Sequence, residues 1–119
     1  MTNYQDLIVW KKSMELTEAV YKLVRYLPKE ETYALSDQMR RAAVSIPSNI
    51  AEGQTRDAKP EFMYFLRIAN GSRAELETQL QLCARLYSLP PEKLNHAREL
   101  CSEVGKMLYA LMNKLKTNN

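Results

Sequence analysis

Apolar residues recur every three or four positions along four stretches of the chain, the periodicity of helices that bury one face. The pattern is strictest in the last stretch, which carries Leu94, Ala97, Cys101, Val104, Leu108, Leu111 and Leu115. The stretch before it carries Phe62, Phe65, Ala69, Ser72, Leu76, Leu80, Cys83 and Tyr87, and the second carries Leu35, Met39, Ala42, Ile46 and Ile50. Together with the apolar residues before position 28, these patterns predict four helices.

Three breaks separate the predicted helices, and each of them contains proline. They lie at residues 27–30 (LPKE), 53–60 (GQTRDAKP) and 88–91 (SLPP), because proline disfavours the helical conformation in the residue before it. Connections this short join neighbouring antiparallel helices. We therefore predict an all-α fold, an up-down antiparallel four-helix bundle formed by a single domain over residues 1–119. We expect this bundle to assemble into a ring.

The first helix, within residues 7–27, carries two apolar stripes rather than one. The first stripe contains Leu7, Trp10, Met14, Tyr21 and Val24, and the second contains Leu16, Val20, Leu23 and Leu27. Together they span roughly 200°, about twice the width that a helix at the edge of a two-layer core needs. Either the bundle surrounds this helix deeply, or one stripe faces another subunit. We favour the second alternative, with Leu16, Val20, Leu23 and Leu27 as interface candidates.

The second helix combines an internal proline with a row of polar residues. Pro47 removes one backbone donor and crowds the carbonyl of Ala43, so a kink is expected there. Glu52 precedes Gly53, the expected helix end, where the dipole disfavours a carboxylate and a cationic partner is needed. Arg40, Arg41 and Arg73 are the candidates for that partner. We favour a polar seam between helices or subunits over a ligand or catalytic site. Its predicted members are Gln38, Arg40, Arg41, Ser45, Asn49, Glu52, Arg73 and Glu75.

Composition and motifs point away from catalysis and from membranes. No apolar run approaches the ~20 residues that cross a membrane, and the first residues do not read as a signal peptide, so we expect a cytoplasmic protein. His96 has no partner motif, and the Glu-x-x-His spacing of di-iron bundles and the glycine-rich phosphate loops are absent. We therefore expect no enzymatic activity, no metal and no cofactor. Cys83 and Cys101 are predicted to be buried, reduced thiols.

Three blocks of sequence carry a resemblance to a known family. They are DLIVWKK at residues 6–12, LSDQMRRAAVSIPSNIAEG at 35–53 and FLRIANGSRAELETQL at 65–80. The chain resembles the four-helix-bundle proteins encoded in intervening sequences of bacterial large-subunit ribosomal RNA genes, from about Tyr4 to Tyr87. The positions that match the signature of that family are Trp10, Gln38, Arg40, Arg41, Ser45, Asn49, Glu52, Gly53, Gly71, Ser72 and Glu75.

The resemblance implies a small cytosolic bundle that forms a homopentamer and has no established enzymatic activity. In this reading Gly53 caps the second helix, and Gly71 and Ser72 allow close helix approach. Arg73 departs from the family pattern, which favours a small or apolar residue there. Accessory proteins of diversity-generating retroelements are a more remote likeness by fold, and they bind nucleic acid and a reverse transcriptase.

These observations leave two candidate functions. The first is an oligomeric scaffold or adaptor that binds itself or another protein. The second is an RNA-binding accessory factor that uses Lys and Arg side chains from several subunits. The net charge of +3 is mild for one chain, but five copies would carry +15 and a ring can focus that field. We favour the scaffold.

Overall fold

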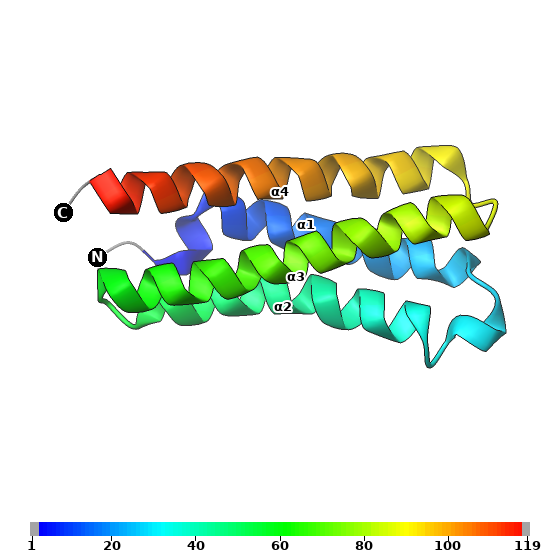
Figure 1. The fold of residues 1–119 in the computed structure, drawn as a ribbon, viewed down its shortest axis with the longest axis horizontal. Helices are drawn as coiled ribbons and strands as arrows, with labels where there is room; N and C mark the ends of the chain where they lie inside the picture. Colours follow the sequence, from blue (N-terminus) through cyan, green and yellow to red (C-terminus); the bar gives the residue numbers. More distant parts are fainter. Residues whose placement is uncertain (1–2, 118–119) are drawn as a thin grey trace.

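The computed structural model describes residues 3–117 and contains four long helices (Figure 1). They are α1 (Ile8–Leu23), α2 (Leu35–Thr55), α3 (Lys59–Leu86) and α4 (Pro91–Thr117). Short 3-10 turns occupy Tyr4–Asp6, Val24–Tyr26 and Lys29–Glu31. The helices run up and down in an antiparallel bundle in which α1 and α3 each pack against both α2 and α4. The predicted all-α four-helix bundle is confirmed. The predicted domain range also includes residues 1–2 and 118–119, which lie outside the described part.

The core runs along the centre of the bundle and corrects the prediction for the first helix. Leu16, Val20 and Leu23 are completely buried and Leu27 is 8% exposed, so all four belong to the core of a single chain. They are therefore not available to a second subunit, and their assignment as interface candidates is wrong. Both stripes of the first helix are apolar, but most of the other one lies at the rim of the bundle: Leu7 and Trp10 are half-buried, and Met14 and Tyr21 are exposed. Its last member, Val24, is 7% exposed and belongs to the core.

The three predicted breaks are found, but their bounds differ: α1 ends at Leu23 and is followed by 3-10 turns, and the break between α2 and α3 is shorter than predicted. Helix α2 continues two residues beyond Gly53, to Thr55, and Gly53 is buried inside it with an ordinary helical backbone. A Cβ on Gly53 would lie 2.8 Å from the Cβ of Phe65 and 3.0 Å from the ring of Phe62. Gly53 therefore lets α2 approach α3 and does not cap the helix.

Pro47 lies within α2, and the helix continues through it. Because proline has no N–H, the carbonyl of Ala43 loses its usual partner four residues ahead. Thr17 of α1 supplies a replacement, since its hydroxyl lies 3.2 Å from the Ala43 oxygen and 2.8 Å from the oxygen of Ser13. The proline thus frees a backbone acceptor that joins α2 to α1.

Candidate functional site

The centre of the predicted polar seam lies between α2 and α3. The hydroxyls of Ser45 and Ser72 are 2.8 Å apart, and the amide of Asn49 donates to both the carbonyl (2.8 Å) and the hydroxyl (2.9 Å) of Ser45. Small side chains allow this approach, as expected for Ser72. The three residues satisfy one another within a single chain, so this part of the seam joins helices.

The outer members of the seam form local pairs on the surface of α2. Arg41 donates to Asp37 at 2.9 Å, and Gln38 is exposed. Glu52 pairs with Arg56 at 2.9 Å. This cationic partner was predicted among Arg40, Arg41 and Arg73, and the sequence reasoning missed Arg56. The signal was present, because positions 52 and 56 are one helical turn apart.

The remaining members of the predicted seam lie elsewhere. Arg40 turns toward the end of α1 and donates to the carbonyl of Thr32 at 3.2 Å. Arg73 faces α4, where its side chain covers Gly105 and donates to Asn70 at 3.0 Å. Glu75 accepts from the amide of Gln79 at 3.3 Å, within α3. The structure therefore divides the predicted seam between the α2–α3 contact, the exposed surface of α2, and the separate positions of Arg40, Arg73 and Glu75.

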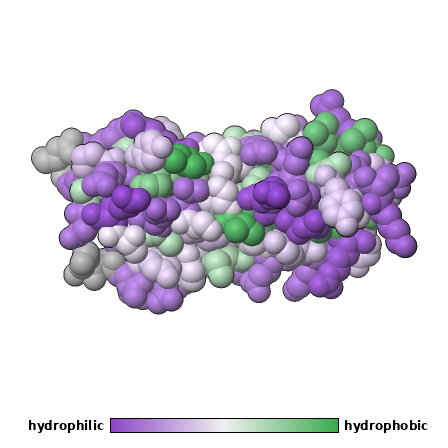
Figure 2. All heavy atoms as spheres, turned by 90° about the horizontal axis from the view of Figure 1, so that it is seen from below, coloured by the Kyte–Doolittle hydropathy of each residue, from purple (hydrophilic) through white to green (hydrophobic). Residues whose placement is uncertain are grey.

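A row of residues on the outer side of α3 was not recognised in the sequence. Tyr64, Ile68, Leu82 and Leu86 are between 36% and 60% exposed. The row follows the alternating four-three spacing of a helix seam, at positions 64, 68, 71, 75, 78 and 82. This spacing is visible in the sequence and could have revealed the row. We call the residues at these positions, together with Leu86, the α3 row. Figure 2 looks at the molecule from the α2 side. It shows hydrophobic areas separated by hydrophilic residues, and one hydrophobic area lies at the end of the bundle where α3 finishes.

Gly71 occupies the middle of the α3 row. It is exposed, and a Cβ added there would meet nothing within 4 Å. The expectation that Gly71 allows close approach of a helix is therefore wrong within the chain. Glycine inside a helix costs about 0.5–1 kcal/mol relative to alanine, and nothing in the described fold offsets that cost.

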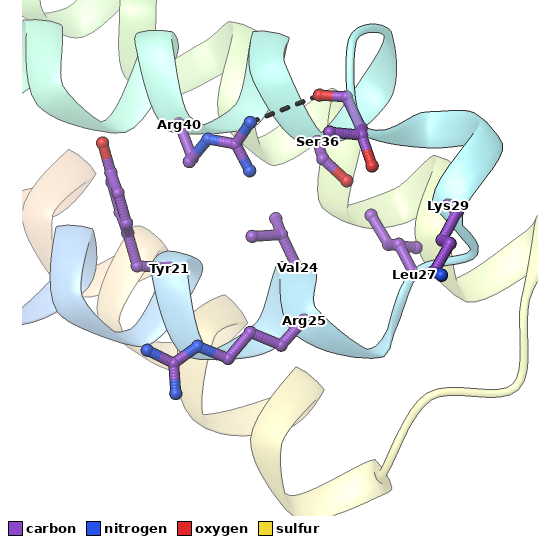
Figure 3. Close-up of a pocket in the computed structure, with 8 residues that line it drawn as sticks. Tyr21, Val24, Arg25, Leu27, Lys29, Ser36 and Arg40 are labelled. Carbon is purple, nitrogen blue, oxygen red and sulfur yellow. Dashed lines mark hydrogen bonds between the residues drawn. The ribbon is translucent and has the colours of Figure 1, made fainter.

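A hollow of about 480 Å³ lies between the end of α1 and the start of α2 (Figure 3). Tyr21, Val24 and Arg25 line one side, Ser36 and Arg40 line the other, and Leu27 and Lys29 lie at one end. A second hollow, also of about 480 Å³, continues along α2 and shares Tyr21 and Arg40 with the first. We call the two together the α1–α2 groove.

Four titratable groups have perturbed pKa values: Lys12, Cys83, Tyr87 and Cys101. The hydrogen bond and the charge of Glu103 raise the pKa of Lys12 above its usual value. The hydroxyl of Tyr87 donates to Glu31 at 2.5 Å, and this bond raises the pKa of Tyr87 to about 12. Burial raises the pKa of Cys83 to about 11, and it raises that of Cys101 to about 11 as well. Both thiols are buried and free, as predicted. At neutral pH they are protonated and therefore weak nucleophiles.

Within residues 3–117, no group of three or more His, Cys, Asp or Glu side chains could hold a metal ion. In the same part of the chain, none of the helices combines the length and apolar character needed to cross a membrane.

The fold and these surfaces define a protein of the four-helix-bundle class. The chain belongs to the 23S rRNA-intervening sequence protein family, whose model matches residues 5–110. It is similar to the crystal structure of a protein of unknown function from the S23 ribosomal protein family of Bacteroides thetaiotaomicron VPI-5482. That likeness has 26% sequence identity and a TM-score of 0.80, and covers 89% of this chain and 96% of the other. No match is found among curated proteins.

Proposed function

We propose that this protein is a non-catalytic scaffold that works as a closed homo-oligomer, a pentamer as the family resemblance implies, in the cytoplasm. The observation that carries assembly is Gly71, an exposed glycine inside α3 where an added Cβ would meet nothing of its own chain within 4 Å. Exposed apolar side chains lie on the same face of α3 before and after it. A glycine at such a place is explained if the backbone of another subunit approaches it closely. Free buried thiols support a reducing compartment.

The rest of the α3 row fits the same role. Its apolar members are one pair before Gly71, Tyr64 and Ile68, and one pair near the end of α3, Leu82 and Leu86. The polar residues Glu75 and Thr78 lie between the pairs, on the same face of the helix. The core of the bundle is already complete in one chain, so these side chains are not needed for folding. A head-to-tail contact would join this face to a different surface of the next subunit, and it closes into a ring when the rotation between subunits completes a full turn.

Light scattering on the purified protein tests assembly directly. We expect a mass near five times the 13.8 kDa of one chain. Ile68→Asp and Leu82→Asp should each give a folded, helical protein of lower mass, because a charge would lie within the contact. Tyr109→Asp, at an exposed position on α4, is the matched control and should keep the wild-type mass. A wild-type protein of 13.8 kDa at micromolar concentration contradicts the proposal.

A second candidate function is RNA binding through phosphate contacts. It is supported by Arg25, Lys29 and Arg40, which gather around the α1–α2 groove. Binding of this kind should differ little among unrelated RNA sequences and should weaken with salt, with a slope of about −0.7 per neutralised phosphate on single strands. Absence of binding at ~50 mM salt would contradict this second candidate and leave the scaffold in place.

A further inference from the structure

In the α1–α2 groove, several cationic side chains surround an apolar floor. Val24 and Leu27 are 7% and 8% exposed and form part of the lining beneath the rim. Arg25, Lys29 and Arg40 lie around them, and the only acidic side chain along the groove is Asp37, in the second hollow. Asp37 is paired with Arg41.

The three cations have no acidic partner among residues 3–117. Salt bridges there involve other basic side chains, and Arg40 makes its bond to the backbone carbonyl of Thr32. Glu31 is close to Lys29 in sequence, but its carboxylate accepts from Tyr87 and from the backbone of Leu35. The bond to Thr32 holds Arg40 at the groove and uses one of its nitrogens, so its other N–H donors are left for a ligand (Figure 3).

Tyr21 gives the groove an aromatic wall. Its side chain stands where the two hollows meet and is 44% exposed. An exposed aromatic ring beside cationic groups is a platform on which a planar base can stack while its phosphate is neutralised. A simple carboxylate would use neither the ring nor the apolar floor.

We propose that the α1–α2 groove binds a nucleotide, with the base against Tyr21 and the phosphate on Arg40, while Arg25 and Lys29 add positive charge at separate edges of the groove. A phosphate monoester carries nearly two negative charges and several acceptor oxygens, so it suits a guanidinium group with free N–H donors in a positively charged groove better than a single carboxylate does. The nucleotide can be a free mononucleotide or one unit of single-stranded RNA. The inference deepens the second candidate function by naming its site, and it does not depend on assembly through α3.

Binding is tested by equilibrium dialysis of the full chain against four probes at low salt: AMP, adenosine, inorganic phosphate and a five-residue oligoadenylate RNA. We expect saturable binding of AMP, at least about tenfold tighter than adenosine or phosphate alone. Tighter binding of the oligoadenylate than of AMP identifies RNA as the source, and the reverse identifies a free nucleotide. Adenosine or phosphate binding as tightly as AMP overturns the proposal, as does the absence of saturation by both AMP and the RNA.

Variants then place the site. Arg40→Ala should weaken AMP binding by about tenfold or more, and Tyr21→Leu should reduce the preference for AMP over phosphate by about fivefold. Arg67→Ala removes the same charge from an exposed position on α3 and should bind AMP as the wild type does. Circular dichroism establishes that each variant is folded. RNA binding that persists in Arg40→Ala and Tyr21→Leu overturns this groove while the RNA candidate itself stands.

Discussion

The two sides of α2 are built differently. On the α3 side, Gly53, Ser45 and Ser72 are small enough for the helices to come close, and the hydroxyls and the Asn49 amide satisfy one another. On the α1 side, the hydroxyl of Thr17 links the middle of α1 to the carbonyl of Ala43 in α2. Toward the end of α1, the side chains of the two helices leave the α1–α2 groove between them. Polar groups that satisfy each other fix a fold, whereas cations left unpaired beside a hollow are available to a ligand.

The largest effect should come from the core stripe of α1. Leu23 is completely buried, so Leu23→Asp places a charge without a partner in the centre of the bundle. We expect a loss of more than about 4 kcal/mol and an unfolded chain at 25 °C. Circular dichroism and urea unfolding measure this loss.

Met14→Asp is the matched control, because Met14 lies on the same helix and is 42% exposed. It should remain helical, with a change within about 0.5 kcal/mol. A helical Leu23→Asp protein of lower mass would restore that stripe as a subunit interface and contradict the core described above.

The close contact of α2 and α3 should be broken by a single methyl group. Gly53→Ala gains helix propensity, but the new Cβ would lie 2.8 Å from the Cβ of Phe65. That atom is fixed to the backbone of α3 and cannot move away by a side-chain rotation. We expect a net destabilisation of about 1–3 kcal/mol, measured by urea unfolding. A variant as stable as the wild type would show that α3 moves away easily.

The sequence predicted the part of the fold that depends on local pattern. The proline-containing breaks at residues 27–30, 53–60 and 88–91 separate the helices that the structure contains. The sequence could not predict which of the two stripes of α1 is buried, because both are apolar. The positions of α2 and α4 decide between them. The cap predicted at Gly53 is wrong for a similar reason, since the role of this glycine depends on Phe65, twelve residues away.

The candidate site was predicted less completely than the fold. Ser45, Ser72 and Asn49 do meet, because three-four spacing places each on the expected face. Arg40 lies one position from Arg41, yet 100° around the helix carries it to the α1 side. The α1–α2 groove joins residues from α1, the connection and α2, and no local pattern brings those three together.

The buried thiols give a pH dependence of intermediate size. Burial raises the pKa of Cys83 and of Cys101 from 9.0 to about 11, so the folded state keeps protons that the unfolded state loses between these values. Stability is therefore unaffected below pH 9 and falls as pH rises toward 11, by the order of 1 kcal/mol per thiol after allowance for solvent screening.

Urea unfolding at pH 8.0 and at pH 10.5 measures this fall. The double variant Cys83→Ala/Cys101→Ala should be less stable at pH 8.0, because it leaves small cavities, but should lose less stability on going to pH 10.5. Tyrosines and lysines titrate in both proteins, so the difference between the two slopes isolates the thiols. Equal slopes would mean that the thiols titrate as they do in the unfolded chain.

The smallest effect should come from Gly71, and its sign separates folding from assembly. Gly71→Ala adds a methyl group that meets nothing in its own chain, so it should stabilise an isolated subunit by about 0.5–1 kcal/mol. Urea unfolding in the Ile68→Asp background measures this gain without a contribution from assembly. In the otherwise wild-type protein the same methyl group would lie where another subunit approaches, and light scattering on dilution should show earlier dissociation. Gly53→Ala loses stability in either background, so the two glycines respond oppositely to one change. A Gly71→Ala protein that is more stable and assembles as the wild type does would remove Gly71 from the subunit contact.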